Sequence, residues 1–124
     1  MSKKILLLFV VILSFALLAL RLASREGQDA AALADFAQCL AARGAVMYGA
    51  NWCPHCQEEK TAFGAAFRFI NYVECPDEPK RCLAAGIENY PTWIFSDGRK
   101  FVGRQGLERL AEASGCILPT PLES

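Results

Sequence analysis

The hydrophobic pattern of the chain begins with an uninterrupted apolar run, Ile5–Leu20, behind a short basic start. As a helix this run is about 24 Å long, whereas the hydrocarbon layer of a membrane is roughly 30 Å thick. Arg21, whose aliphatic stem can snorkel, and the two apolar residues after it close most of that gap. We therefore predict a membrane-spanning signal anchor over residues 1–23.

A cleaved secretory signal is the main alternative, and a buried core helix is a third interpretation. A small-x-small cleavage site is hard to find, because cleavage after Ala23 places Arg21 at the −3 position. We favour the uncleaved anchor. Lys3 and Lys4 then stay in the cytoplasm and the rest of the chain lies outside, although Arg21 and Arg25 add positive charge on the far side.

Beyond the anchor the pattern alternates between helical and strand periods. Residues 24–33 are expected to form a linker, because Ser24–Ala30 is polar; residues 34–117 form a domain and residues 118–124 a loose tail. The predicted elements are helix 29–43, strand 45–50, helix 56–69, strand 69–75, helix 80–86, strand 90–96, a turn at 97–98, strand 100–103 and helix 106–115.

This order predicts an α/β domain with a mixed four-stranded sheet flanked by helices. The strands at 45–50 and 69–75 are joined by a helix, so they should be parallel with a right-handed crossover. The last two strands are joined by Asp97–Gly98, which is typical of an antiparallel hairpin at one edge of the sheet.

The composition indicates the kind of compartment in which the protein works. The 124 residues carry no net charge, which fits one domain and gives no indication of a nucleic-acid partner. Six cysteines in so short a chain indicate disulfides, and hence an oxidising compartment.

Two cysteines, Cys53 and Cys56, form a C-x-x-C motif where a buried strand gives way to a helix. The helix N-terminus favours the thiolate, so we expect Cys53 to be the exposed nucleophile. Cys56 lies one turn later on the face of Phe63 and Phe67, so it should be the buried resolving thiol. A purely structural disulfide is the alternative, but so small a loop stabilises little.

The two residues between these cysteines are Pro54 and His55. Proline suits the first turn of a helix, where its missing N–H is no loss. A polarised or protonated imidazole beside Cys53 would stabilise the thiolate and make the disulfide more oxidising. The alternative is an exposed histidine without a special role.

The run "GAVMYGANWCPHCQEEK" and the later "YPTW" resemble the thioredoxin superfamily. With "INYVEC", "AAGIENYPTW" and "GLERLAEASG", residues 34–116 resemble the thioredoxin-like domain fused to bacterial and plant vitamin K epoxide reductase (VKOR) homologues. The tetrapeptide "CPHC" alone also equals the active site of the periplasmic oxidase family DsbA.

The resemblance implies a thioredoxin-like fold, a cis peptide bond before Pro91, and a substrate surface that includes Tyr90 and Pro91. Trp52 would line the same surface beside Pro54, or else be a plain core aromatic like Trp93. It further implies disulfide exchange between cysteine-containing substrate proteins and a quinone-linked membrane oxidoreductase of the VKOR or DsbB type. The redox group would be the Cys53–Cys56 disulfide, with no cofactor or metal.

One position departs from the pattern. Thioredoxin and DsbA carry a buried acidic residue six positions before the first active cysteine, where this chain has Met47. The proton acceptor for the resolving thiol would then be Glu58, Glu59 or water, and we expect both glutamates to face solvent.

Four further cysteines allow three pairings. A proline turn separates Cys75 from Cys82, so we favour that pair, and Cys39–Cys116 follows by elimination. The second pair is harder to place, because the first and last helices of a thioredoxin fold usually cover opposite faces of the sheet. Electron relay by Cys75 and Cys82 is the alternative role.

The chain is thus interpreted as a monomeric, single-pass protein disulfide oxidoreductase with its domain on the periplasmic, extracytoplasmic or thylakoid-lumen side. A thiol reductant or isomerase, for instance one serving cytochrome c maturation, is the redox alternative. Zinc binding fits poorly, because the second cysteine pair is too widely spaced. Copper handling by Cys53, Cys56 and His55 remains an alternative.

Overall fold

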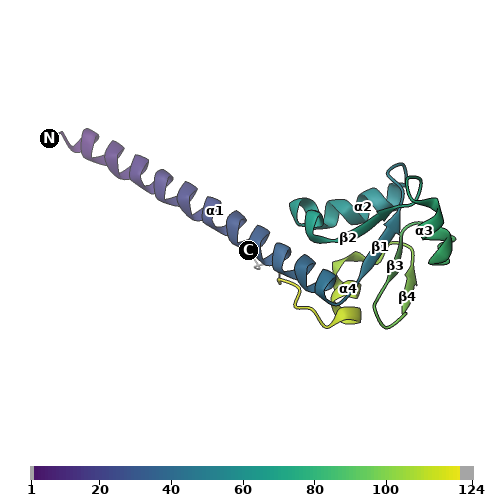
Figure 1. Ribbon diagram of the computed structural model, residues 1–124. Coiled ribbons are helices and arrows are strands. Elements are labelled where there is room, and N and C mark those ends of the chain that lie inside the picture. Colours follow the sequence, from purple (N-terminus) through teal and green to yellow (C-terminus); the bar gives the residue numbers. More distant parts are fainter. Residues whose placement is uncertain (1, 121–124) are drawn as a thin grey trace. The chain divides into compact units, whose positions relative to one another are not determined.

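A computed structural model describes residues 2–120 of the chain (Figure 1). The chain divides into two compact units, Met1–Ala31 and Ala32–Ser124. Helix α1 (Lys3–Ala42) supplies most of the first unit and the first helical turns of the second. Of the predicted tail, residues 118–120 form neither helix nor strand, and residues 121–124 lie outside the described residues.

Within the described range, α1 is the one helix long and apolar enough to cross a membrane. Its apolar residues are exposed over residues 5–20.

The polar segment predicted as a linker is helical in the structure. Residues 24–33 lie inside α1, and the Ser24 hydroxyl donates a hydrogen bond of 2.8 Å to the Leu20 carbonyl within it. Serine, arginine, glutamate and glutamine are all compatible with a helix, and Gly27 alone costs only about 1 kcal/mol. A change from apolar to polar composition marks the end of the apolar run, not the end of the helix.

The sheet has four strands, β1 (Val46–Gly49), β2 (Asn71–Glu74), β3 (Thr92–Ile94) and β4 (Lys100–Val102), in the order β2-β1-β3-β4. β1 and β2 are parallel, whereas β3 is antiparallel to both of its neighbours. This confirms the predicted mixed sheet with a hairpin at one edge. The strands are shorter than predicted by one to four residues.

Three further α-helices follow β1, namely α2 (Pro54–Phe63), α3 (Pro79–Ala84) and α4 (Gly106–Ser114). The single helix predicted over residues 56–69 is wrong in its second half, which is the 3₁₀ helix η1 (Gly64–Phe69). Gly64 ends α2 with a φ of +54°, a conformation that glycine adopts without strain.

Side chains alternate between the two faces of the sheet. On one face, Met47 and Trp93 belong to the main core, which also contains Phe36 of α1, Phe63 of α2 and Leu110 of α4. On the other face Val73 forms a smaller cluster with the Cys75–Cys82 pair. The ends of α1 and α4 thus share one core.

Candidate active site

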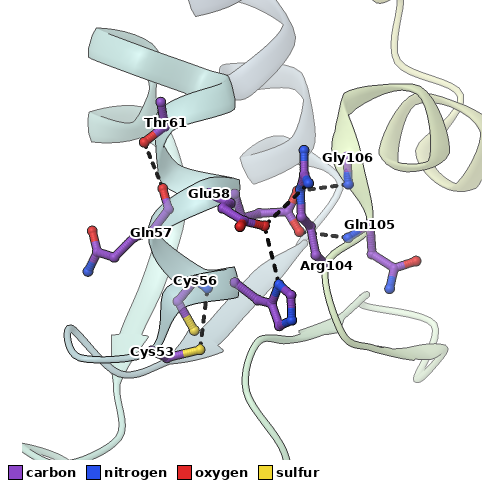
Figure 2. Close-up of polar contacts among 10 residues, drawn as sticks. Cys53, Cys56, Gln57, Glu58, Thr61, Arg104, Gln105 and Gly106 are labelled. Carbon is purple, nitrogen blue, oxygen red and sulfur yellow. Dashed lines mark hydrogen bonds and ion pairs between the residues drawn. The ribbon is translucent and has the colours of Figure 1, made fainter.

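The loop between β1 and α2 places both cysteines of the C-x-x-C motif. Cys53 is the N-cap of α2 with an extended backbone, and Pro54 occupies the first helical turn. The backbone N–H of Cys56 donates to Cys53 Sγ at 3.3 Å (Figure 2). A sulfur in this place accepts from a backbone donor that the first turn of a helix would otherwise leave unpaired.

Both sulfur-bearing residues are reduced and buried. Cys56 is fully buried, as predicted, but Cys53 is only 6% exposed, so its predicted exposure was wrong. Cys53 belongs to the main core, and Tyr90 packs against that core. A side chain at a helix start was expected to face solvent, but the tertiary packing around the loop covers most of this one.

Cys56 is strongly biased toward its neutral thiol. Burial, assisted by a hydrogen bond to Cys53, raises the pKa of Cys56 from 9.0 to about 12. The positive charge of Lys60 and a backbone contact at Ala50 oppose this shift but do not reverse it. At neutral pH Cys56 therefore carries a proton that it must lose before it can act as a nucleophile.

His55 is exposed and held by its neighbours on the outer side of α2. Its Nδ1 lies 3.2 Å from Glu58 Oε2. Arg104 contacts the same carboxylate oxygen at 3.3 Å (Figure 2). Glu58 faces solvent, as predicted. Arg104 follows β4 and was not singled out from sequence, because nothing local predicts that it reaches α2.

Glu59 is fully buried, so the prediction that it faces solvent was wrong. Its carboxylate accepts hydrogen bonds from the indole Nε1 of Trp93 at 3.3 Å and from the backbone N–H groups of Gln105 at 2.7 Å and Gly106 at 2.8 Å. These three donors compensate for burying a carboxylate and tie α2 to the start of α4.

A polar pair on β2 lies beneath the cysteine loop. The Tyr72 hydroxyl donates to the Glu74 carboxylate, and Glu74 also accepts the backbone N–H of Asn51 at 2.8 Å. Tyr72 pairs in register with Met47, and Glu74 pairs with Gly49. Sequence reasoning missed both residues, although the parallel pairing places Tyr72 beside the position that lacks an acid.

Gly49 allows the Cys56 sulfur and the Tyr72 ring to approach each other. A Cβ at Gly49 would lie 2.9 Å from Cys56 Sγ, 3.3 Å from Tyr72 Cε2 and 3.4 Å from the Tyr72 hydroxyl. Burial, with hydrogen bonding to Glu74, holds the pKa of Tyr72 well above its usual range. The phenol therefore keeps its proton at neutral pH.

The second loop of the site carries the cis peptide bond Tyr90–Pro91. Tyr90 meets Trp52 edge-on, with ring centroids 5.9 Å apart, and Trp52 is 68% exposed. Trp52 is thus a surface aromatic beside the cysteines, whereas Trp93 is a core residue, as predicted. Pro91 is fully buried.

The remaining four cysteines are paired as Cys75–Cys82 and Cys39–Cys116, with Cα–Cα distances of 5.7 and 5.9 Å. These are the pairings favoured from sequence. The expectation that the first and last helices cover opposite faces was wrong, because both contribute to the main core. Cys116 lies just after α4 and reaches the end of α1 directly.

Over residues 2–120 the structure gathers no group of three histidine, cysteine or acidic side chains in a metal-binding arrangement.

No protein-family model matches the chain. The chain is similar to a thiol-disulfide oxidoreductase. This protein, thiol-disulfide oxidoreductase LTO1 of Arabidopsis thaliana, is 46% identical over an alignment of 84 residues that covers 60% of this chain. The chain spans only 22% of that relative's length.

Proposed function

We propose that this chain is a membrane-tethered thiol–disulfide oxidoreductase of thioredoxin-like fold, whose Cys53–Cys56 pair passes disulfides to secreted proteins. The observation that carries the proposal is the pairing of a helix-capping Cys53 with a buried, protonated Cys56 one turn later. Thiol–disulfide exchange needs such a pair, with one sulfur poised as a thiolate and a second within reach.

In the oxidising direction, a client thiolate attacks Cys53 Sγ of the Cys53–Cys56 disulfide. The Cys53–Cys56 bond breaks, and Cys56 leaves with the electron pair and takes up a proton. A second client thiolate then attacks the client sulfur of the mixed disulfide, which forms the client disulfide and releases the Cys53 thiolate. Two electrons have moved from the client to the cysteine pair.

The exposed surface around Cys53 is the proposed client platform. Trp52 and Tyr90 present an apolar edge beside the reacting sulfur, and Tyr90 precedes the cis-proline. We assign substrate contact to these residues together with Pro54, whereas the fully buried Pro91 shapes the loop that presents Tyr90.

The membrane side of the proposal rests on α1. Helix α1 is long and apolar enough to span a membrane, and Lys3 and Lys4 would stay in the cytoplasm. The domain then works on the extracytoplasmic side, where the two further disulfides are stable. A quinone-linked membrane oxidoreductase of the VKOR or DsbB type would reoxidise the cysteine pair.

Trapping in cells tests this proposal. Full-length Cys56→Ala cannot resolve mixed disulfides, so it should accumulate covalent complexes with client proteins and with one multi-span membrane protein. The Cys53→Ala/Cys56→Ala variant is the matched control and should trap nothing. If client proteins are trapped but no multi-span membrane protein is, the proposed membrane partner is wrong. If no covalent complexes form at all, the proposed disulfide-exchange activity is wrong.

The reduction potential decides the direction. A potential near those of DsbA or protein disulfide isomerase, about −120 to −180 mV, supports a disulfide donor. A value near thioredoxin, about −270 mV, would show that the pair acts as a reductant instead. A stoichiometric bound metal without disulfide turnover would replace the redox assignment with metal handling.

A further inference from the structure

Cys56 poses a proton problem that the residues assigned so far do not solve. When Cys56 attacks a mixed disulfide on Cys53, it must first lose its proton, and its pKa of about 12 makes spontaneous loss rare at neutral pH. Met47 faces the same core and cannot accept a proton. Glu59 is occupied by three N–H donors, and Glu58 is engaged with His55 and Arg104.

The β2 strand brings a different pair of groups to this sulfur. Tyr72 and Glu74 lie on the same face of β2, the face that Met47 and Gly49 occupy on β1. Because Gly49 has no side chain, it leaves a space between these groups. A Cβ placed there would lie 2.9 Å from Cys56 Sγ, and 3.3 and 3.4 Å from the Tyr72 ring and hydroxyl. The Tyr72 hydroxyl is the one proton-exchanging oxygen among those atoms.

The hydroxyl is already connected to an acceptor. Tyr72 donates to Glu74, and the same carboxylate accepts the backbone N–H of Asn51 in the cysteine loop. Both Tyr72 and Glu74 are half-buried, so the relay has a buried end at the sulfur and an end that reaches solvent.

The charged and titratable groups around this path come from α2, from its N-cap and from β2. From α2, Lys60 lies with its Nζ 4.0 Å from the centre of the Tyr72 ring. From the N-cap of α2, Cys53 faces Cys56, and from β2 the Glu74 carboxylate faces the phenol. The Lys60 cation stabilises negative charge developing on Cys56 and Tyr72 while the proton moves.

On the basis of the proposed function, we propose that Tyr72 and Glu74 form the proton relay of the resolving cysteine. The Cys56 thiol gives its proton to the Tyr72 oxygen while the Tyr72 hydroxyl gives its own to Glu74. Cys56 Sγ then bonds to Cys53 Sγ, the bond from Cys53 to the partner sulfur breaks, and the partner leaves as a thiolate with the electron pair. Glu74 returns the proton to solvent. The same path in reverse protonates Cys56 when it is the leaving group.

A two-burst experiment on the full chain in detergent isolates this step. After mild reduction that leaves the two structural disulfides intact, the protein is mixed with dithiobis-nitrobenzoate, an aromatic disulfide whose thiolate is coloured. Attack by Cys53 releases one coloured thiolate, and resolution by Cys56 releases a second. Cys56→Ser should lose the second burst, which identifies it.

Tyr72→Phe keeps the ring beneath Lys60 and removes only the hydroxyl, and Glu74→Gln keeps an oxygen for Asn51 but cannot accept the proton. We expect each variant to leave the first burst unchanged and to slow the second at least about tenfold at neutral pH. The deficit should shrink toward about pH 10, where hydroxide replaces the relay. The double variant should be no slower than either single variant, because the groups act in series.

Tyr48→Phe is the matched control, because Tyr48 packs against the smaller cluster on the opposite face of the sheet and should leave both bursts unchanged. The relay is overturned if the second burst in Tyr72→Phe and Glu74→Gln has the same rate and pH profile as in the wild type. A wild-type protein that gives no second burst would instead overturn the proposed function.

Discussion

Glu59 accepts a hydrogen bond from the indole of Trp93, 3.3 Å away, and both side chains are fully buried. They lie far apart in the sequence, on α2 and β3. Together with the Gln105 and Gly106 backbone donors, this bond makes the carboxylate a structural junction beside the active-site helix. The buried carboxylate is tolerated in the core because both of its oxygens accept hydrogen bonds.

Replacing Glu59 by glutamine should therefore destabilise the protein, even though the two side chains have nearly the same shape. The two carboxylate oxygens accept three donors, and an amide turns one acceptor into an NH₂ group that faces a backbone N–H. We expect a loss of about 2–4 kcal/mol in the free energy of unfolding, measured by chemical denaturation of the full chain in detergent.

Glu58→Gln is the control for that measurement, because the adjacent Glu58 is exposed and its ion pairs are screened by solvent. Its loss should stay below about 1 kcal/mol. Equal losses of unfolding free energy in the two variants would contradict a stabilising role for the buried hydrogen bonds of Glu59.

Gly49 should not tolerate even one added carbon. Its Cβ would be only 2.9 Å from Cys56 Sγ and 3.3 Å from the Tyr72 ring, in a buried part of the sheet. We expect Gly49→Ala to cost about 1–3 kcal/mol of unfolding free energy and to slow resolution by Cys56, as followed by the second burst. Gly27→Ala, in helix α1 with no atom within 4 Å, should be neutral or slightly stabilising.

The raised pKa of Cys56 predicts where its thiolate appears. In the reduced protein, thiolate absorbance assigned to Cys56 by difference from Cys56→Ala should be absent at neutral pH and grow only as the pH approaches 12. Titration of this sulfur near its ordinary value of 9.0 would contradict the buried, hydrogen-bonded environment.

The same shift has a consequence for stability. The folded-state pKa lies above the unfolded value, so the native state holds this proton more tightly than the unfolded chain does. Its contribution to stability is complete below about pH 9 and is lost as the pH rises from there toward about 12. Reduced wild type should therefore lose stability over that range faster than reduced Cys56→Ala does.

The two structural disulfides should differ in what their removal costs. Cys39–Cys116 joins residues 77 positions apart, whereas Cys75–Cys82 joins residues 7 apart. On a chain-entropy basis the longer loop stabilises by about 4–5 kcal/mol and the shorter by about 2–3 kcal/mol.

Paired serine substitutions, Cys39→Ser/Cys116→Ser against Cys75→Ser/Cys82→Ser, measure this difference by denaturation. The long-loop pair should lower the free energy of unfolding more. An equal or reversed order would mean that native packing, not loop closure, sets the contribution of each bond.

The sequence by itself determined the elements and the chemistry. Short apolar and β-branched runs predicted the four strands, and the connections between them predicted their parallel and antiparallel pairing. Helical periodicity predicted the buried side of Cys56. The C-x-x-C spacing at a strand-to-helix junction predicted the redox pair. The turn between Cys75 and Cys82 was enough to favour their bond.

Only the tertiary structure decided the environment of the site. The sequence predicted Glu59 as a solvent-facing helix residue, but Trp93 and the start of α4 pack on it. The sequence also predicted Cys53 as exposed, but the surrounding core covers it. Tyr72 and Glu74 reach the cysteine loop because the parallel register sets them beside Met47 and Gly49. Burial and hydrogen-bond partners come from residues distant in the sequence, and local patterns carry no information about those contacts.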